Sequence, residues 1–273
     1  MARLGGPAEA GWLLEEVAGA SLATLLAGGR PDPGAGEVEA LERLVQRRLA
    51  GEPLQHVLST WSFRRLELRV DGRALVPRPE TEVVAGHALA ALAAARQGRN
   101  EALVAVDLGT GSGAIACALV TEDPDVSVVA VDRSAAALEL AGENRARLLP
   151  FEADRLELRL GSWYEPLGDL AGSVALVVSN PPYLAAHELP GLDPVVRDFD
   201  PPEALVAGKT GLEAIEAVLG GAPELLRPGG SLVLELAPHQ GQAARALALG
   251  AGASFAALHL DLAGRTRCLV ATW

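Results

Sequence analysis

The alternation of short apolar runs with helical patterns in the later part of the chain constrains its fold most. Runs that read as β-strands are rich in Val, Leu and Ala and lie at 101–109, 126–134, 154–163, 173–183 and 229–238. Helical patterns lie between or after them, at 113–122, 135–149 and 211–226. Strands that alternate with helices predict a doubly wound, mostly parallel α/β sheet with helices on both faces. Two further extended runs in 254–273 predict an antiparallel C-terminal hairpin, which makes a sheet of seven strands.

The residues before this region differ in character. Apolar residues recur at three- and four-residue spacing in 10–28 and 36–53, and each pattern stops at Gly or Pro, which predicts helices. Apolar and polar residues then alternate around Asp71-Gly72, a dipeptide typical of a tight hairpin turn. The predicted parts are a small helical domain at 1–62, a β-hairpin linker at 63–85 and an α/β domain at 86–273.

Composition excludes several classes of protein. Hydrophobic residues make up 49% of the chain, which is too many for a disordered protein and enough for a sizeable core. The net charge of −12 disfavours direct binding to nucleic acid, because it repels the phosphates. Neither a signal peptide nor an apolar run of membrane-spanning length is evident, so we expect a cytoplasmic protein without a membrane partner. Cys117 and Cys268 are expected to be reduced core thiols, and we expect no metal.

The polar and glycine-rich residues of interest all follow predicted strands. They are Asp107 to Gly113, Asp132, Ser162-Trp163 and Asn180 to Tyr183. In an open α/β sheet, ligands bind beyond the carboxyl ends of the strands, near the point where the strand order reverses. We therefore expect these four groups to line one crevice.

The loop "DLGTGSGA" has the spacing of a nucleotide-binding turn. Its glycines, within Gly109–Gly113, permit a tight turn and close approach of a ligand to the backbone. Asp107 would repel a pyrophosphate and attract an amine, and Asp132 is placed to bind both ribose hydroxyls. Together they suit a nucleoside with a cationic amino-acid arm, S-adenosylmethionine, on whose adenine Trp163 would stack. The alternative is a closely packed turn without a ligand, with Trp163 as a packing residue.

The tetrapeptide Asn180-Pro181-Pro182-Tyr183 predicts a stiff, extended turn at the end of a strand. Proline fixes its own φ and restricts the residue before it, so Asn180 is held rigidly. A planar amide nitrogen is a poor nucleophile because its lone pair is delocalised. Asn180 Oδ1 and the Pro181 carbonyl are acceptors for both its N–H groups, and they would hold it in line with a methyl donor while Tyr183 covers its face. The alternative is a rigid turn with a capping asparagine.

Several segments together resemble the protein glutamine-N5 methyltransferases that modify peptide-chain release factors, the HemK family. They are "DLGTGSGAIA", "VDRS", "SNPPYL", "PRPETE" at 77–82, "GEPLQHVLSTWSF" and "DPPEALVAGKTGLEAI". The resemblance covers nearly the whole chain and implies a seven-stranded Rossmann-like sheet that uses S-adenosylmethionine and releases S-adenosylhomocysteine. The implied substrate is the glutamine of the Gly-Gly-Gln loop in bacterial class 1 release factors. The helical domain would grip another part of the factor, and we expect a monomer.

The resemblance also implies roles for individual residues. The implied cofactor-binding residues are Gly109, Thr110, Gly111, Ser112, Gly113, Asp132, Trp163 and Asn180. The implied substrate-binding residues are Asn180, Pro181, Pro182 and Tyr183, and the implied catalytic residues among them are Asn180, Pro181 and Tyr183. This chain departs from the family at several positions. Ser162 stands where the family often has an acid near the adenine, and His56 and Ser59 stand where Tyr and Gly are common. Arg64-Arg65 replace an aromatic residue and a glycine.

Three other functions fit parts of this pattern. A glutamine methyltransferase that acts on a ribosomal protein shares the tetrapeptide and an N-terminal helical extension. An amino methyltransferase that acts on nucleic acid would flip a base into the pocket and usually has a basic surface, which the net charge of −12 argues against. A non-enzymatic protein that binds S-adenosylmethionine has no use for an intact Asn-Pro-Pro-Tyr.

Overall fold

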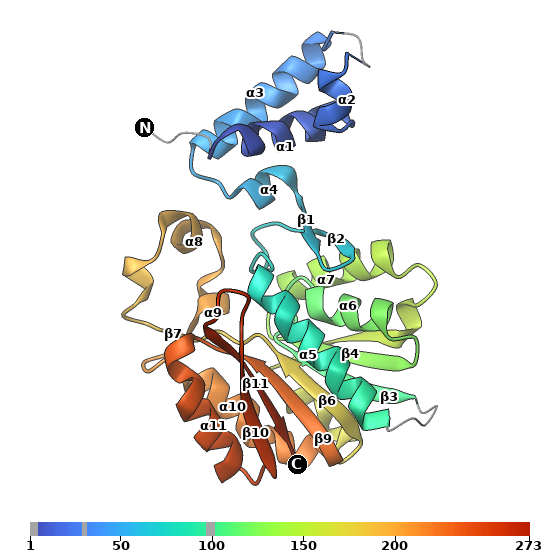
Figure 1. Ribbon diagram of the computed structural model, residues 1–273, viewed down its shortest axis with the longest axis vertical. Coiled ribbons are helices and arrows are strands. Elements are labelled where there is room, and N and C mark those ends of the chain that lie inside the picture. Colours follow the sequence, from blue (N-terminus) through green and yellow to red (C-terminus); the bar gives the residue numbers. More distant parts are fainter. Residues whose placement is uncertain (1–4, 29–31, 97–101) are drawn as a thin grey trace.

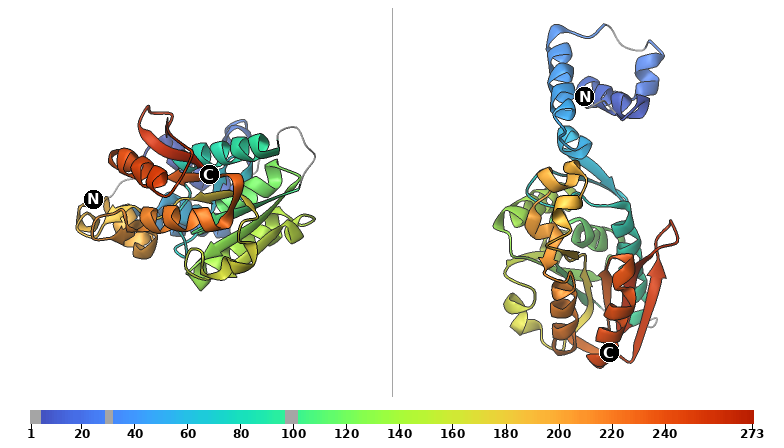
Figure 2. Two further views of the ribbon diagram at one scale, coloured as in Figure 1. Left: turned by 90° about the horizontal axis from the view of Figure 1, so that it is seen from below. Right: turned by 90° about the vertical axis from the view of Figure 1, so that its left-hand side faces the viewer.

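A helical region stands apart from a sheet-containing body, and a narrow neck joins the two (Figures 1 and 2). The computed structural model describes residues 5–28, 32–96 and 102–273. The helices of the first region are α1 (Pro7–Ala18), α2 (Leu22–Leu26), α3 (Ala35–Leu49) and α4 (Leu54–Leu58). Its small core is built on Leu13, Leu54, Val57 and Leu58.

The helical pattern at 10–28 forms two helices rather than one. Gly19 ends α1 in the left-handed conformation, with φ of 61°, and its amide donates to the carbonyl of Glu15. Ser21 then begins α2, because its hydroxyl accepts a hydrogen bond from the amide of Thr24. A left-handed glycine ends a helix, and a serine N-cap begins the next one. The prediction of one continuous helix over 10–28 was therefore wrong.

The predicted turn of the linker hairpin is also wrong. The hairpin pairs β1 (Thr60–Phe63) with β2 (Leu66–Arg69), and its turn is Arg64-Arg65. Arg64 takes a left-handed φ of 53°, and its guanidinium holds both carboxylate oxygens of Glu122, at 2.5 and 2.8 Å. Asp71-Gly72 instead opens the loop after β2, where Asp71 Oδ1 accepts from the amide of Arg73. Contacts with a distant helix therefore decide the turn, against the local preference of Asp-Gly.

Ser59 explains why a glycine is favoured at its position. It follows α4 with a left-handed φ of 60°, a conformation that costs a residue with a Cβ atom about 1 kcal/mol. We expect Ser59→Gly to raise the free energy of unfolding by about 0.5–1 kcal/mol in chemical denaturation. Ser62→Gly is the matched control, since Ser62 lies in β1 and glycine there weakens a strand. A lower stability of Ser59→Gly would contradict this account.

The body of the molecule is a seven-stranded sheet within the described residues, as predicted. Its strands are β3 (Leu103–Leu108), β4 (Val126–Asp132), β5 (Leu156–Leu160), β6 (Val174–Ser179), β9 (Leu226–Glu235), β10 (Phe255–Leu260) and β11 (Thr266–Thr272). Their order is β10-β11-β9-β6-β3-β4-β5, parallel except for β11 against both β9 and β10. The order reverses at β3, which has β4 on one side and β6 on the other. Residue 101, the predicted start of the first strand, lies outside the described residues.

Helices cover both faces of this sheet (Figure 1). They are α5 (Pro79–Arg96), α6 (Ala114–Glu122), α7 (Ala135–Leu148), α10 (Glu213–Leu225) and α11 (Gly241–Gly250). Alternation along the strands divides the apolar side chains between two cores. For example, Ala105 packs in the core with α5 and α6, whereas Val106 and Leu108 pack in the core with α10 and α11. Cys117 and Cys268 are free and buried, which confirms the expected core thiols.

Two of the helices and several short elements were not predicted. Helix α5 begins inside "PRPETE", which the alternation pattern had assigned to the hairpin linker, and α11 has no predicted counterpart. The short elements between 153 and 240 are η1 (Ala153–Arg155), η2 (Glu165–Leu170), β7 (Leu184–Ala185), η3 (Leu189–Gly191), α8 (Pro194–Phe199), α9 (Pro202–Leu205), β8 (Val206–Gly208) and η4 (Pro238–Gln240). Within the described residues, the helices are all too short or too polar to cross a membrane.

Candidate active site

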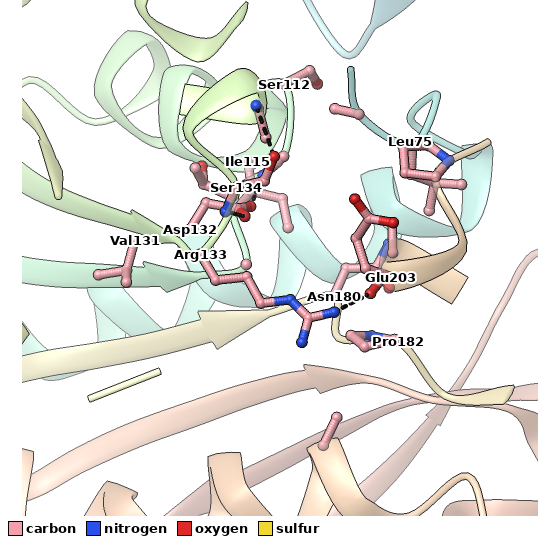
Figure 3. A pocket seen from close by; sticks show the side chains of 18 of the residues that line it. Leu75, Ser112, Ile115, Val131, Asp132, Arg133, Ser134, Asn180, Pro182 and Glu203 are labelled. Atoms are coloured by element: carbon pink, nitrogen blue, oxygen red, sulfur yellow. Dashed lines mark hydrogen bonds between the residues drawn. The ribbon is translucent and has the colours of Figure 1, made fainter. Parts of the chain in front are cut away.

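A cavity of about 280 Å³ opens beyond the carboxyl ends of β3, β4 and β6 (Figure 3). This is the place where the strand order reverses, and the predicted residues come together there. The predicted residues that line it are Gly109, Thr110, Gly111, Ser112, Asp132, Ser162, Trp163, Asn180 and Pro182. Among the described residues, the predicted ones that lie outside its lining are Asp107, Leu108, Gly113, Pro181 and Tyr183.

The three glycines of the first loop do different things. Gly109 and Gly111 have left-handed φ angles of 72° and 56° and form the cavity wall. A Cβ atom on Gly109 would lie 3.9 Å from the ring of Trp163, so it would fill part of the space beside that ring. A Cβ atom on Gly113 would lie 3.2 Å from the Cβ of Ala141, so this glycine instead permits α6 and α7 to pack closely.

The two aspartates also occupy different places. Asp132 lies in the cavity wall, and its carboxylate accepts from the amides of Gly111 and Ser134, each at 2.9 Å. A carboxylate offers about four acceptor positions, so Asp132 retains capacity for ligand hydroxyls. Asp107 is 1% exposed, and its carboxylate accepts from the hydroxyl of Thr110 at 2.7 Å. Burial raises the pKa of Asp107 to about 7, and the expected attraction of Asp107 for an amine stays a prediction.

Trp163 has the conformation of a constrained site residue. Its backbone is left-handed, with φ of 48°, which is rare for a bulky side chain and usually found where the surrounding structure imposes it. Its ring lies in the cavity wall beside Gly109. The neighbouring Ser162 lines the cavity as well, and its amide donates to Glu165 Oε2 at 3.1 Å.

Asn180 is held by a contact that sequence reasoning missed. Its Nδ2 donates to the hydroxyl of Thr81 at 3.2 Å, and that hydroxyl donates to Glu235 Oε2 at 2.8 Å. Asn180 Oδ1 is buried and has no hydrogen-bond partner among the described residues. An unpaired buried acceptor is costly, so such an atom marks a position where a donor is expected to bind. The signal for Thr81 was its place in "PRPETE".

The side chain of Gln240 holds the end of the Asn-Pro-Pro-Tyr turn in place. Gln240 donates to the carbonyl oxygens of Tyr183, at 2.8 Å, and Gly211, at 2.9 Å. Burial and the nearby Glu235 carboxylate raise the pKa of the Tyr183 phenol, so it stays protonated at neutral pH. The roles of Pro181 and Tyr183 stay predictions.

Two segments that the sequence did not indicate as part of the site complete the cavity wall. The linker contributes Arg73, Ala74, Leu75 and Pro77, and the segment after α8 contributes Pro201, Glu203, Ala204, Val206 and Ala207. Arg133 extends from the end of β4 across the cavity and donates to the carbonyl of Glu203 at 3.2 Å (Figure 3). Pro201 and Glu203, in the long segment between the Asn-Pro-Pro-Tyr turn and β8, therefore form part of the cavity wall.

Comparison with known proteins identifies the family of this chain. Residues 88–192 match the family described as "Methyltransferase small domain", and residues 6–58 match the "PrmC N-terminal domain". A protein of Xylella fastidiosa named "Release factor glutamine methyltransferase" is 40% identical over 86% of this chain and 82% of its own. A protein of the same name from Streptomyces coelicolor is 44% identical over 82% of this chain and 77% of its own. Another from Bordetella pertussis is 39% identical over 95% of this chain and 92% of its own. The chain belongs to the release factor glutamine methyltransferase family.

The cavity of this family member fits S-adenosylmethionine, the methyl donor. Asp132 has free acceptor positions for ligand hydroxyls, and Trp163 offers a flat ring for stacking. The loop from Gly109 to Ser112 lines the same cavity, and its glycines leave the backbone open to a ligand. Asn180 and Pro182 close the side opposite Asp132 (Figure 3). The residues that would hold the methyl donor therefore line the same cavity as Asn180, whose Oδ1 is unpaired.

Proposed function

We propose that this chain transfers a methyl group from S-adenosylmethionine to the side-chain amide nitrogen (N5) of the glutamine in the Gly-Gly-Gln loop of bacterial class 1 release factors. The observation that carries the proposal is the buried, unpaired Oδ1 of Asn180 beside the glycine loop. An acceptor in this place suits a substrate that brings N–H groups, as a primary amide does. The names of the relatives supply the class of substrate.

The reaction requires positioning more than acid or base chemistry. S-adenosylmethionine supplies an electrophilic methyl group when bound. Asn180 Oδ1, with the Pro181 carbonyl as the second acceptor, would take the two N–H groups of the substrate and hold its nitrogen in line with that methyl group. The same hydrogen bonds favour the geometry in which the nitrogen lone pair is no longer shared with the carbonyl. The nitrogen would form its bond to the methyl carbon as the bond from that carbon to the sulfonium sulfur breaks and S-adenosylhomocysteine leaves, and the nitrogen would then lose its extra proton to water.

The helical region is proposed to dock the substrate protein. It exposes several large apolar side chains, including Trp12 at 46% and Leu26 at 79%, and a docked partner would bury them. Strands β1 and β2 lie between the helical region and the seven-stranded sheet (Figures 1 and 2). The division at 1–62, 63–85 and 86–273, the monomeric state and the cytoplasmic location stay predictions of the same proposal.

A label-transfer experiment tests the substrate. We expect label from methyl-labelled S-adenosylmethionine on an intact release factor, and none on the factor with Gln→Ala in its Gly-Gly-Gln loop or on a duplex DNA. A mixture of ribosomal proteins, assayed in parallel, tests the closest alternative. Label on a ribosomal protein but not on the factor would reject the proposed substrate and leave the methyltransferase chemistry standing.

A further inference from the structure

A line of hydrogen bonds connects the ends of three elements behind the site. It runs from Glu235 at the end of β9, through Thr81 in the first turn of α5, to Asn180 just after β6. Thr81 is 3% exposed and Glu235 is 1% exposed, so water does not compete for either group. Asn180 and Thr81 both line the cavity, and Glu235 stands behind them.

The direction of these hydrogen bonds determines which end of the Asn180 amide is free. The Oδ1 and Nδ2 ends have nearly the same shape, and rotation by half a turn exchanges an acceptor for a donor. A hydroxyl has one hydrogen, and an ionised Glu235 can only accept, so the hydrogen of Thr81 is committed to Glu235. Thr81 then offers Asn180 a lone pair alone, which Nδ2 can use and Oδ1 cannot.

We propose that Thr81 and Glu235 are positioning residues that orient the Asn180 amide, so that the site presents Oδ1 to the substrate and selects a side-chain amide over a carboxylate. This inference rests on the proposed function. A glutamine brings two N–H groups to Oδ1 and the Pro181 carbonyl, whereas a glutamate brings only acceptors and is repelled by both. Without the hydroxyl of Thr81, the Asn180 amide is free to rotate, and its Nδ2 end would accommodate a carboxylate.

The charges around Glu235 add a dependence on pH. Burial raises the pKa of Glu235 to about 7, and Glu80 acts in the same direction, while Thr81, Arg267 and Arg78 lower it. Tyr183 and Cys268 also face this carboxylate, and both stay protonated at neutral pH. Below about pH 7 a protonated Glu235 can donate, which releases the Thr81 hydrogen toward Asn180 and removes the preference for one orientation.

The test compares Thr81→Val, which removes the hydroxyl at nearly constant shape, with Thr81→Ser, which keeps it. We expect Thr81→Val to lower kcat about tenfold and Thr81→Ser to retain most of it. Thr272→Val, at the far end of β11, is the control for loss of a hydroxyl and should match wild type. Circular dichroism and thermal unfolding will show whether each variant is folded. Wild-type kcat in a folded Thr81→Val would overturn the inference.

Two further readouts separate orientation from general damage. A release factor with Glu in place of the glutamine should inhibit wild type less than the factor with Ala there, and this difference should disappear in Thr81→Val. Below about pH 7, kcat of wild type should fall, and Glu235→Gln should flatten this limb. An unchanged preference against the Glu factor in Thr81→Val, or an unchanged acid limb in Glu235→Gln, would overturn the inference.

A measurement on the protein without substrate distinguishes failure of this inference from failure of the proposed function. Nuclear magnetic resonance of ¹⁵N-labelled protein should show an Asn180 side-chain N–H protected from solvent exchange at pH 8. The protection should persist in Thr81→Ser and be lost in Thr81→Val. If wild type labels no release factor, the proposed function fails, and this measurement still decides the orientation: an unprotected Asn180 amide in wild type would overturn it.

Discussion

Asn180→Ala is expected to lower kcat for methyl transfer by at least about a hundredfold while the Kd for S-adenosylmethionine changes only a few-fold. The variant removes the buried acceptor Oδ1, and alignment of a reacting nitrogen is worth about this much when one positioning contact is lost. The cofactor depends mainly on other parts of the cavity, the glycine loop and Asp132. Single-turnover kinetics with a release factor measures the rate, and calorimetry measures the affinity.

The outcome for Asn180→Ala separates positioning from binding. A wild-type rate in this variant would reject the role of Oδ1 as an acceptor for the substrate amide. Loss of cofactor affinity alone would mean that Asn180 serves the donor and not the substrate. Because Thr81 also loses one of its two hydrogen-bond partners in this variant, thermal unfolding is needed to show that the site remains folded.

Asp132→Ala is expected to weaken the binding of S-adenosylmethionine by about 1–3 kcal/mol, or roughly five- to 150-fold. The carboxylate is placed to accept from the ribose hydroxyls, and it also holds the amides of Gly111 and Ser134 at 2.9 Å. Removing it therefore deletes ligand contacts and loosens the loop that carries the glycines. At saturating cofactor, much of kcat should return, which is the reverse of the pattern expected for Asn180→Ala.

Calorimetry with S-adenosylmethionine and S-adenosylhomocysteine checks this expectation. Asp132→Asn is the matched control, since it keeps one acceptor oxygen without the charge, and its affinity should lie between those of wild type and Asp132→Ala. Equal affinities in all three proteins would place the ribose elsewhere in the cavity.

The parts of the fold that could be predicted are those with a local signal. Strands β3, β4 and β6 read as apolar runs because they are buried on both faces, and their order with the helices specifies a parallel sheet. Helix α5 was missed because its many alanines carry little helical periodicity and its first residues looked extended. The hairpin turn was misplaced because Glu122, which holds Arg64, lies 58 residues away in the chain.

The sequence by itself determined the succession of the seven sheet strands along the chain, the helices α6, α7 and α10, the glycine loop, Asp132, Trp163 and the turn at Asn180. Each of these is a short motif whose position at a strand end follows from local periodicity and from the rule that ligands bind at the carboxyl ends. Only the tertiary structure decided that Gly113 serves helix packing and that residues 73–77 and 201–207 wall the cavity. It also decided that Thr81 joins Asn180, 99 residues away, to Glu235, 154 residues away. Hydrogen bonds at such separations have no periodicity in the chain, because they exist only once the sheet and α5 have brought their ends together.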